Sequence, residues 1–153
     1  MRKTWLTILI LCLLMNAATA ETKITLTFGG DCVLGTREEW VGDAGNFEDC
    51  VAANGMDWCF SGVGDLFRQD DLTLVNLECV LQDSFKGHNN KKQHTFRGKT
   101  AYAQMLVDAG IEAVNIANNH YIDYNRSGEE STKAALEAVG VEYCGYKNLF
   151  VFE

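Results

Sequence analysis

The chain has 153 residues, with 13 Lys and Arg against 21 Asp and Glu, which gives a formal net charge of −8 at pH 7. An acidic surface of this kind argues against nucleic acid and anionic membrane surfaces as partners. The length is sufficient for one domain with a hydrophobic core, and nothing in the composition indicates a second domain.

Residues 1–20 have the composition of a secretory signal peptide. Two basic residues precede an apolar run from Trp5 to Met15, and small residues stand at the positions that signal peptidase reads before cleavage. We expect cleavage after Ala20 and a secreted or extracytoplasmic protein formed by residues 21–153. The apolar run is shorter than the roughly 20 residues of a transmembrane helix, so membrane association would require an uncleaved leader.

Cysteine usage is consistent with export but does not define a disulfide framework. Cys50 and Cys59 could form a local disulfide in an oxidising compartment, and an odd number of cysteines leaves at least one thiol unpaired. No CxxC spacing occurs, so a structural zinc site is not expected. Five cysteines follow the leader, namely Cys32, Cys50, Cys59, Cys79 and Cys144.

The first predicted strand leads to an acidic residue. Residues 23–28 (KITLTF) alternate and are rich in β-branched side chains, which predicts a strand that runs out into two glycines and Asp31. Glycines at a strand end allow a sharp turn and a close approach to a ligand, although an ordinary turn is the alternative. Residues 35–56 are irregular, with a short helix expected over residues 47–53.

A second strand is predicted over residues 71–77 (DLTLVNL), after a short helix over residues 62–68. Asn76 lies within this apolar run and Glu78 follows it directly. Because burying polar groups without partners is costly, these two side chains need hydrogen-bonding partners or a ligand.

A polar loop over residues 82–93 is locally basic in an otherwise acidic chain. Its cations could steer an anionic substrate toward a site, but a solvated and mobile loop is the interpretation we favour. The basic side chains in and just after the loop are Lys86, His88, Lys91, Lys92, His94 and Arg97.

The third strand lies in residues 112–123 (EAVNIANNHYID). Its apolar run breaks into Asn118, Asn119 and His120, which is typical of a buried strand that ends at a site. An amide oxygen and an imidazole suit metal binding or proton transfer near neutral pH. The alternative is a polar turn with a solvated histidine.

Two helices are predicted around this strand. Residues 100–109 carry apolar side chains at helical intervals and stop at a glycine. Ser127, with a glutamate three residues later, matches a capping box and predicts a helix that ends at Gly140. Residues 141–144 begin another short strand.

The alternation of strands and helices predicts an α/β fold, in which a layered sheet has helices on both faces. Ligands of parallel sheets bind beyond the carboxyl ends of the strands. Asp31, Glu78 and residues 118–120 each follow a strand, so we expect them to meet at one edge. Such a mixed oxygen and nitrogen set suits a divalent metal such as manganese, iron or zinc.

The same residues carry a resemblance to a known family over roughly residues 24–146. Three motifs, in this order, resemble those of the bacterial capsule-synthesis proteins of CapA type, which belong to poly-γ-glutamate biosynthesis. That family is similar in fold to the calcineurin-like metallophosphoesterases, which have a metal cluster at the strand ends. The motifs are Gly30-Asp31, Asn76-Leu77-Glu78 and Ala117-Asn118-Asn119-His120 with Asp123.

The resemblance implies that Asp31, Glu78 and Asn119 bind the metal and that His120 is catalytic. In metal-assisted hydrolysis the ion lowers the pKa of a bound water, and the histidine would protonate the leaving group or contact phosphate. An anionic polymer or a phosphate-containing substrate is implied, together with the capsule-synthesis machinery as a partner.

The family pattern continues with later histidine motifs that complete the metal site, whereas this chain has only three histidines. We therefore expect the N-terminal portion of a CapA-like domain, truncated after about half of it, with an incomplete metal site. Three functions remain open. They are an exported capsule-synthesis protein with metal-dependent hydrolase chemistry, an extracellular metallophosphoesterase acting on phosphate esters, and a truncated non-catalytic remnant or assembly module.

Overall fold

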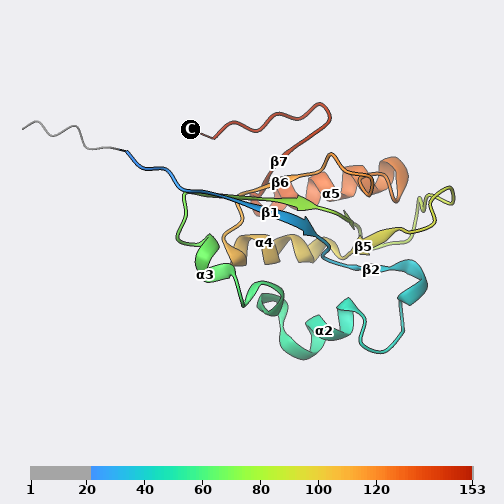
Figure 1. Cartoon of the computed structure of the whole chain (residues 1–153). Helices are drawn as coiled ribbons and strands as arrows, with labels where there is room; N and C mark the ends of the chain where they lie inside the picture. The colour runs from blue at the N-terminus through green and yellow to red at the C-terminus, as the bar shows by residue number, and fades with distance from the viewer. Residues whose placement is uncertain (1–21, 153) are drawn as a thin grey trace, which may run out of the picture.

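The computed structural model describes residues 22–152, so the predicted leader over residues 1–20 lies outside the described part (Figure 1). Its centre is a four-stranded sheet in the order β1-β3-β6-β7, in which all neighbouring strands are parallel. A mostly parallel sheet with helices around it confirms the predicted α/β class. The strands are β1 (Leu26–Cys32), β3 (Leu72–Leu77), β6 (Ala113–Asn115) and β7 (Glu142–Cys144).

A second, three-stranded sheet in the order β2-β5-β4 was not predicted. Its strands are too short for side-chain periodicity to reveal them. Gly98 of this sheet lies against the segment that precedes β2, since a Cβ on Gly98 would lie 1.8 Å from the carbonyl oxygen of Leu34. Because β2 and β4 follow β1 and β3 closely in the chain, this sheet lies beyond their carboxyl ends. The strands are β2 (Thr36–Arg37), β4 (Val80–Leu81) and β5 (Phe96–Gly98).

The helices agree well with the predicted positions. The helices Ala103–Ala109 and Asn125–Val139 end at glycines in the left-handed conformation, Gly110 at φ 82° and Gly140 at φ 77°. Within residues 22–152 no helix has the length and apolarity needed to cross a membrane. The elements are η1 (Glu38–Trp40), α2 (Phe47–Asn54), η2 (Met56–Phe60), α3 (Gly64–Phe67), η3 (Thr100–Tyr102), α4 (Ala103–Ala109) and α5 (Asn125–Val139).

The prediction that Ser127 caps the last helix is wrong. Helix α5 begins at Asn125, and Tyr124 occupies the N-cap position. The Ser127 hydroxyl lies inside the first turn, within hydrogen-bond distance of the carbonyl oxygens of Tyr124 and Lys86. A tertiary contact with the preceding loop therefore replaces the local capping pattern.

The first strand also differs from the prediction. It covers Leu26–Cys32 rather than residues 23–28, so the glycine pair and Asp31 lie inside the strand instead of in a turn after it. Its pairing with β3 shifts register between Phe28 and Asp31, which marks a β-bulge. Gly29 packs closely against β3, since a Cβ there would lie 2.8 Å from Val75 Cγ1.

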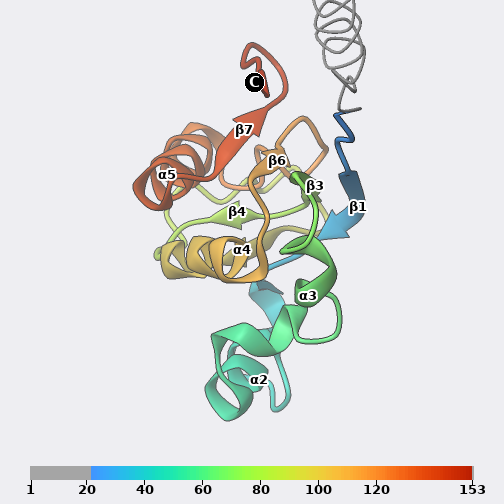
Figure 2. The same cartoon turned by 90° about the vertical axis from the view of Figure 1, so that its left-hand side faces the viewer.

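The hydrophobic core lies between the sheet and helices α4 and α5. These two helices contact each other and lie on the same side of the sheet (Figure 2). Val75 and Val114, which are paired across β3 and β6, belong to this core. The other face, where the prediction also placed helices, carries Leu26 and Phe28, which are 47% and 69% exposed. The hydrophobic core therefore lies mainly on one face of the sheet, and the polar residues stand at the carboxyl ends of β1, β3 and β6.

Candidate functional site

Asn76, at the carboxyl end of β3, connects the polar residues of three strands. Its Nδ2 atom donates hydrogen bonds to Asp31 Oδ1 at 2.7 Å and to Glu78 Oε2 at 2.5 Å. Its Oδ1 atom accepts from Asn115 Nδ2 at 2.8 Å and from Asn118 Nδ2 at 3.0 Å. Both N–H donors and both acceptor positions of the Asn76 amide are therefore used. These hydrogen bonds fix the orientation of the amide and offset the cost of placing a polar side chain within an apolar strand.

Strand register places these side chains at one level. Asp31 pairs with Asn76 across β1 and β3, and Asn76 pairs with Asn115 across β3 and β6. Parallel strands expose their carboxyl ends at the same edge, as expected from the sequence. The structure therefore brings Asp31 and Glu78 to the two hydrogens of a single amide.

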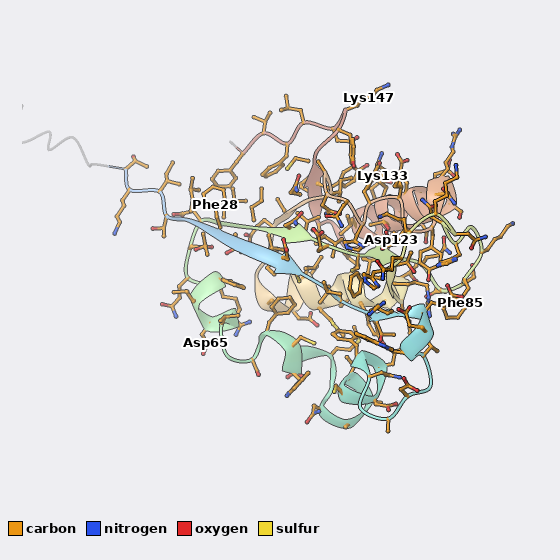
Figure 3. All side chains as sticks on the ribbon, turned by 45° about the vertical axis from the view of Figure 1, so that its right-hand side comes forward. Phe28, Asp65, Phe85, Asp123, Lys133 and Lys147 are labelled. Atoms are coloured by element: carbon orange, nitrogen blue, oxygen red, sulfur yellow. The ribbon has the colours of Figure 1, made fainter. Side chains whose placement is uncertain are left out.

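A buried carboxylate contacts the Nδ1 side of the His120 ring. Asp123, which is 0% exposed, lies inside the molecule (Figure 3), and its Oδ2 atom is 2.7 Å from His120 Nδ1. The same oxygen accepts the backbone N–H of Phe96 at 2.6 Å, and Oδ1 accepts from Lys92 Nζ at 2.5 Å. Because a carboxylate oxygen accepts hydrogen bonds, this contact favours the ring form with its hydrogen on Nδ1, which leaves Nε2 free.

The free side of the imidazole faces Glu78. His120 Nε2 lies 4.0 Å from Glu78 Oε1, which is too long for a direct hydrogen bond, and both side chains are 12% exposed. The ring of Phe96 meets the imidazole edge to face, with 4.7 Å between the ring centres. The arrangement places a carboxylate and a proton-carrying group next to each other in a partly dehydrated position.

Not every candidate residue joins this group. Asn119 is exposed, and its backbone carbonyl contacts the Lys92 ammonium. Its neighbour Asn118 does belong to the group, since the Oδ1 atom of Asn118 accepts a hydrogen bond from the backbone N–H of His120 at 3.0 Å. His88 and His94 lie elsewhere, against Thr95 and Arg37 respectively.

The donor set fits one side of a metal site. The carboxylates of Asp31 and Glu78 are hard oxygen ligands of the kind that Mn²⁺ accepts, and His120 Nε2 presents a lone pair nearby. In residues 22–152, however, no group of three or more His, Cys, Asp or Glu is close enough to hold an ion. The assignment of Asp31, Glu78 and Asn119 as ligands of manganese, iron or zinc stays a prediction.

The loop expected to be mobile is tied to the turn that carries His120. The backbone N–H of Asn89 donates to the carbonyl of Asp123 at 2.9 Å, and Asn125 Nδ2 donates to the carbonyl of Gly87 at 2.8 Å. Lys92 from the same loop contacts the Asp123 carboxylate. Most side chains of the loop are exposed, as predicted for a solvated loop, and these contacts anchor it to the turn; its mobility stays a prediction. Its hydrogen bonds join residues more than 30 positions apart, which local composition does not reveal.

All five described cysteines are free thiols in the structure. Burial raises the pKa of the Cys32 thiol from 9.0 to about 12, with a smaller contribution from the nearby Cys59. Burial also raises the pKa of the Cys79 thiol, which lies wholly inside the core. Since the thiolate is the reactive form, both residues should be chemically inert in the folded protein.

We expect iodoacetamide at pH 8 to leave Cys32 and Cys79 unmodified in the folded protein. With its pKa raised from 9.0 to about 12, Cys32 should hold roughly a thousandfold less thiolate than an ordinary thiol at that pH. Peptide mass spectrometry measures the labelling, and the same reaction in guanidinium chloride provides the control in which both residues react. Rapid labelling of Cys79 in the folded protein would contradict the described core.

Together, the fold and the site define an α/β protein with a carboxylate and imidazole group at the carboxyl edge of a parallel sheet. The family model "Bacterial capsule synthesis protein PGA_cap" matches residues 25–149, and the chain belongs to this family.

Two curated relatives agree with this assignment. The chain is 26% identical over 125 residues to "Capsule biosynthesis protein CapA" of Bacillus anthracis, which covers 80% of this chain and 28% of that protein. It is 30% identical over 139 residues to "PGA biosynthesis protein CapA" of Bacillus subtilis (strain 168), covering 84% of this chain and 35% of that protein. The chain thus spans about a third of the length of each relative.

Proposed function

We propose that this chain takes part in making an extracellular capsular polymer such as poly-γ-glutamate, and that the edge of its parallel sheet carries out metal-dependent hydrolysis. The names of the two relatives describe capsule and PGA biosynthesis, and extending that role to this shorter chain is part of the proposal. The observation that carries it is the meeting of Asp31, Glu78 and His120 within the segment that matches the family.

Each residue has a distinct part in the proposed chemistry. Asp31 and Glu78 would hold a divalent ion, with Asn119 as the third ligand that the family resemblance implies. When bound, such an ion supplies an acidified water and neutralises negative charge on the reacting group. Asn76 keeps the two carboxylates together, because its N–H groups offset the repulsion between their charges.

His120 would exchange its proton at Nε2, since Nδ1 is engaged with Asp123. A histidine in this arrangement can protonate a leaving group or accept a proton from water. The Asp123 carboxylate would keep the ring turned toward Glu78. This division of work resembles other sites in which a buried carboxylate orients a histidine.

An anionic polymer is the proposed substrate, and the extracytoplasmic space is the proposed location. Lys86 and Lys91 are exposed on the loop that contacts the His120 turn, and their charges remain available to an acidic ligand. The predicted leader would deliver the chain to the compartment where capsular polymers accumulate.

The proposal predicts that the purified chain binds Mn²⁺ with a stoichiometry near one and that Glu78→Gln weakens binding at least about tenfold, because a carboxylate ligand becomes neutral. Isothermal titration calorimetry measures both. Asp43→Asn, which neutralises an exposed acid that is not part of the site, should leave binding unchanged. Absence of stoichiometric binding would count against a working metal site.

The hydrolase activity is tested on the same proteins by incubating them with poly-γ-glutamate and MnCl₂. Size-exclusion chromatography should show shortening of the polymer by the unmodified chain and by Asp43→Asn, but not by Glu78→Gln. Binding of Mn²⁺ with an unchanged polymer length would refute hydrolysis of this substrate. Turnover of phosphate esters under the same conditions would instead favour a metallophosphoesterase.

A further inference from the structure

Lys92 reaches from the polar loop into the turn that carries His120. Its ammonium group lies 2.5 Å from Asp123 Oδ1 and also contacts the backbone carbonyl of Asn119. The Lys92 side chain is 22% exposed, whereas that of Asp123 is 0% exposed. The cation therefore neutralises a carboxylate that water does not reach.

The position of Lys92 is set by several hydrogen bonds of its loop. Asn89 donates from its backbone to the Asp123 carbonyl at 2.9 Å and from Nδ2 to the Ile122 carbonyl at 3.3 Å. The backbone N–H of Lys92 donates to the Asn89 carbonyl at 3.0 Å, which turns the lysine back toward the site. Loop and turn thus form one hydrogen-bonded unit around Asp123.

We propose that Lys92 is a positioning residue for His120, acting through Asp123. With Lys92 bound to Oδ1, the carboxylate keeps Oδ2 directed at His120 Nδ1. The ring then carries its hydrogen on Nδ1 and presents the Nε2 lone pair toward Glu78. Without the ammonium, a buried carboxylate is costly and turns toward water, which releases the imidazole.

The use of His120 in hydrolysis rests on the proposed function, but the hydrogen-bonded arrangement does not. From the sequence alone, Lys92 is one of several cations predicted either to steer an anionic substrate or to lie in a solvated, mobile loop. Its actual partner, Asp123, lies 31 residues away in the chain. Lys92 therefore has a defined role at the site that is separate from substrate attraction.

The test is nitrogen NMR of the full chain with ¹⁵N-labelled histidine, recorded without metal at alkaline pH, where the rings are neutral. The chain has three histidines, and His120 is identified as the signal that His120→Gln removes. In the unmodified chain the form with hydrogen on Nδ1 should exceed the other by at least about tenfold, because the Asp123 hydrogen bond favours it. An excess of the form with hydrogen on Nε2 would overturn the proposal without any variant.

Three variants separate positioning from general stability. Lys92→Met removes the charge and should lower the ratio of the two ring forms at least about fivefold, whereas Lys92→Arg should retain it. Lys91→Met, a change at the exposed neighbour, should have no effect on the ratio. A folded Lys92→Met protein with the original ratio would overturn the proposal. If Lys92→Met does not fold, Lys92→Gln provides the neutral variant, with the same expected loss.

This measurement is independent of the proposed chemistry. The expected ring form together with no hydrolysis of any polymer would remove the proposed function and leave the role of Lys92 intact. If the protein hydrolyses the polymer but the ring form of His120 does not depend on Lys92, the proposed function stands and the role of Lys92 is overturned.

Discussion

Replacing Asp123 by Ala should lower the free energy of unfolding by about 3–5 kcal/mol, the cost of breaking a buried ion pair from one side. The carboxylate is completely buried and accepts hydrogen bonds from the Phe96 backbone, His120 and Lys92. Alanine removes the acceptor of the Phe96 N–H and leaves the Lys92 ammonium with only the carbonyl oxygen of Asn119. Urea denaturation followed by circular dichroism measures the loss.

The matched control is Asp43→Ala, which removes an exposed carboxylate and should change stability by no more than about 0.5 kcal/mol. The loss of stability in Asp123→Asn should lie between those of Asp123→Ala and Asp43→Ala, because the amide oxygen preserves one acceptor while the charge is lost. A loss below about 1 kcal/mol for Asp123→Ala would show that the carboxylate is hydrated, in conflict with the described burial.

Asn76→Asp should destabilise the protein by about 2–4 kcal/mol at neutral pH, although the two side chains have nearly the same shape. Two N–H donors between Asp31 and Glu78 are replaced by an oxygen, so that three carboxylates converge. The same substitution creates an additional oxygen ligand for a cation. Part of the lost stability should therefore return when MnCl₂ is added, since binding to the folded state stabilises it.

Thermal unfolding with and without MnCl₂ measures both effects. The matched control is Gln69→Glu, which makes the same change from amide to carboxylate on an exposed residue between α3 and β3. It should be nearly neutral and insensitive to the ion. An Asn76→Asp protein as stable as the unmodified chain would mean that the amide does not separate two charged carboxylates.

The elements that the sequence predicts well have strong periodic patterns. The apolar run over residues 71–77 and the run before Asn118 became β3 and β6, and the order of the strands placed Asp31, Glu78 and His120 at one edge. Polar residues inside an apolar run were the useful signal, since Asn76 had to find partners and did so on both neighbouring strands.

The features that were missed depend on partners distant in sequence. The strands β2, β4 and β5 have only two or three residues each, so they carry no period to detect. Ser127 has the local pattern of a helix cap, but the loop carbonyl of Lys86 and the chain path through Tyr124 determine its position. The role proposed for Lys92 could not be predicted for the same reason, because the sequence around a basic residue in a polar loop does not indicate that its partner is a buried carboxylate.

The amide of Asn76 has a further consequence for any cation that the protein encounters. Folding alone has already assembled two acidic side chains around a neutral donor, so an arriving ion meets oxygen atoms whose directions are set beforehand. The conformational freedom that flexible carboxylates lose on binding is lost here before the ion arrives. Selection among ions of different radius should then follow from how far the strand ends can separate, because the ligands are anchored in the sheet.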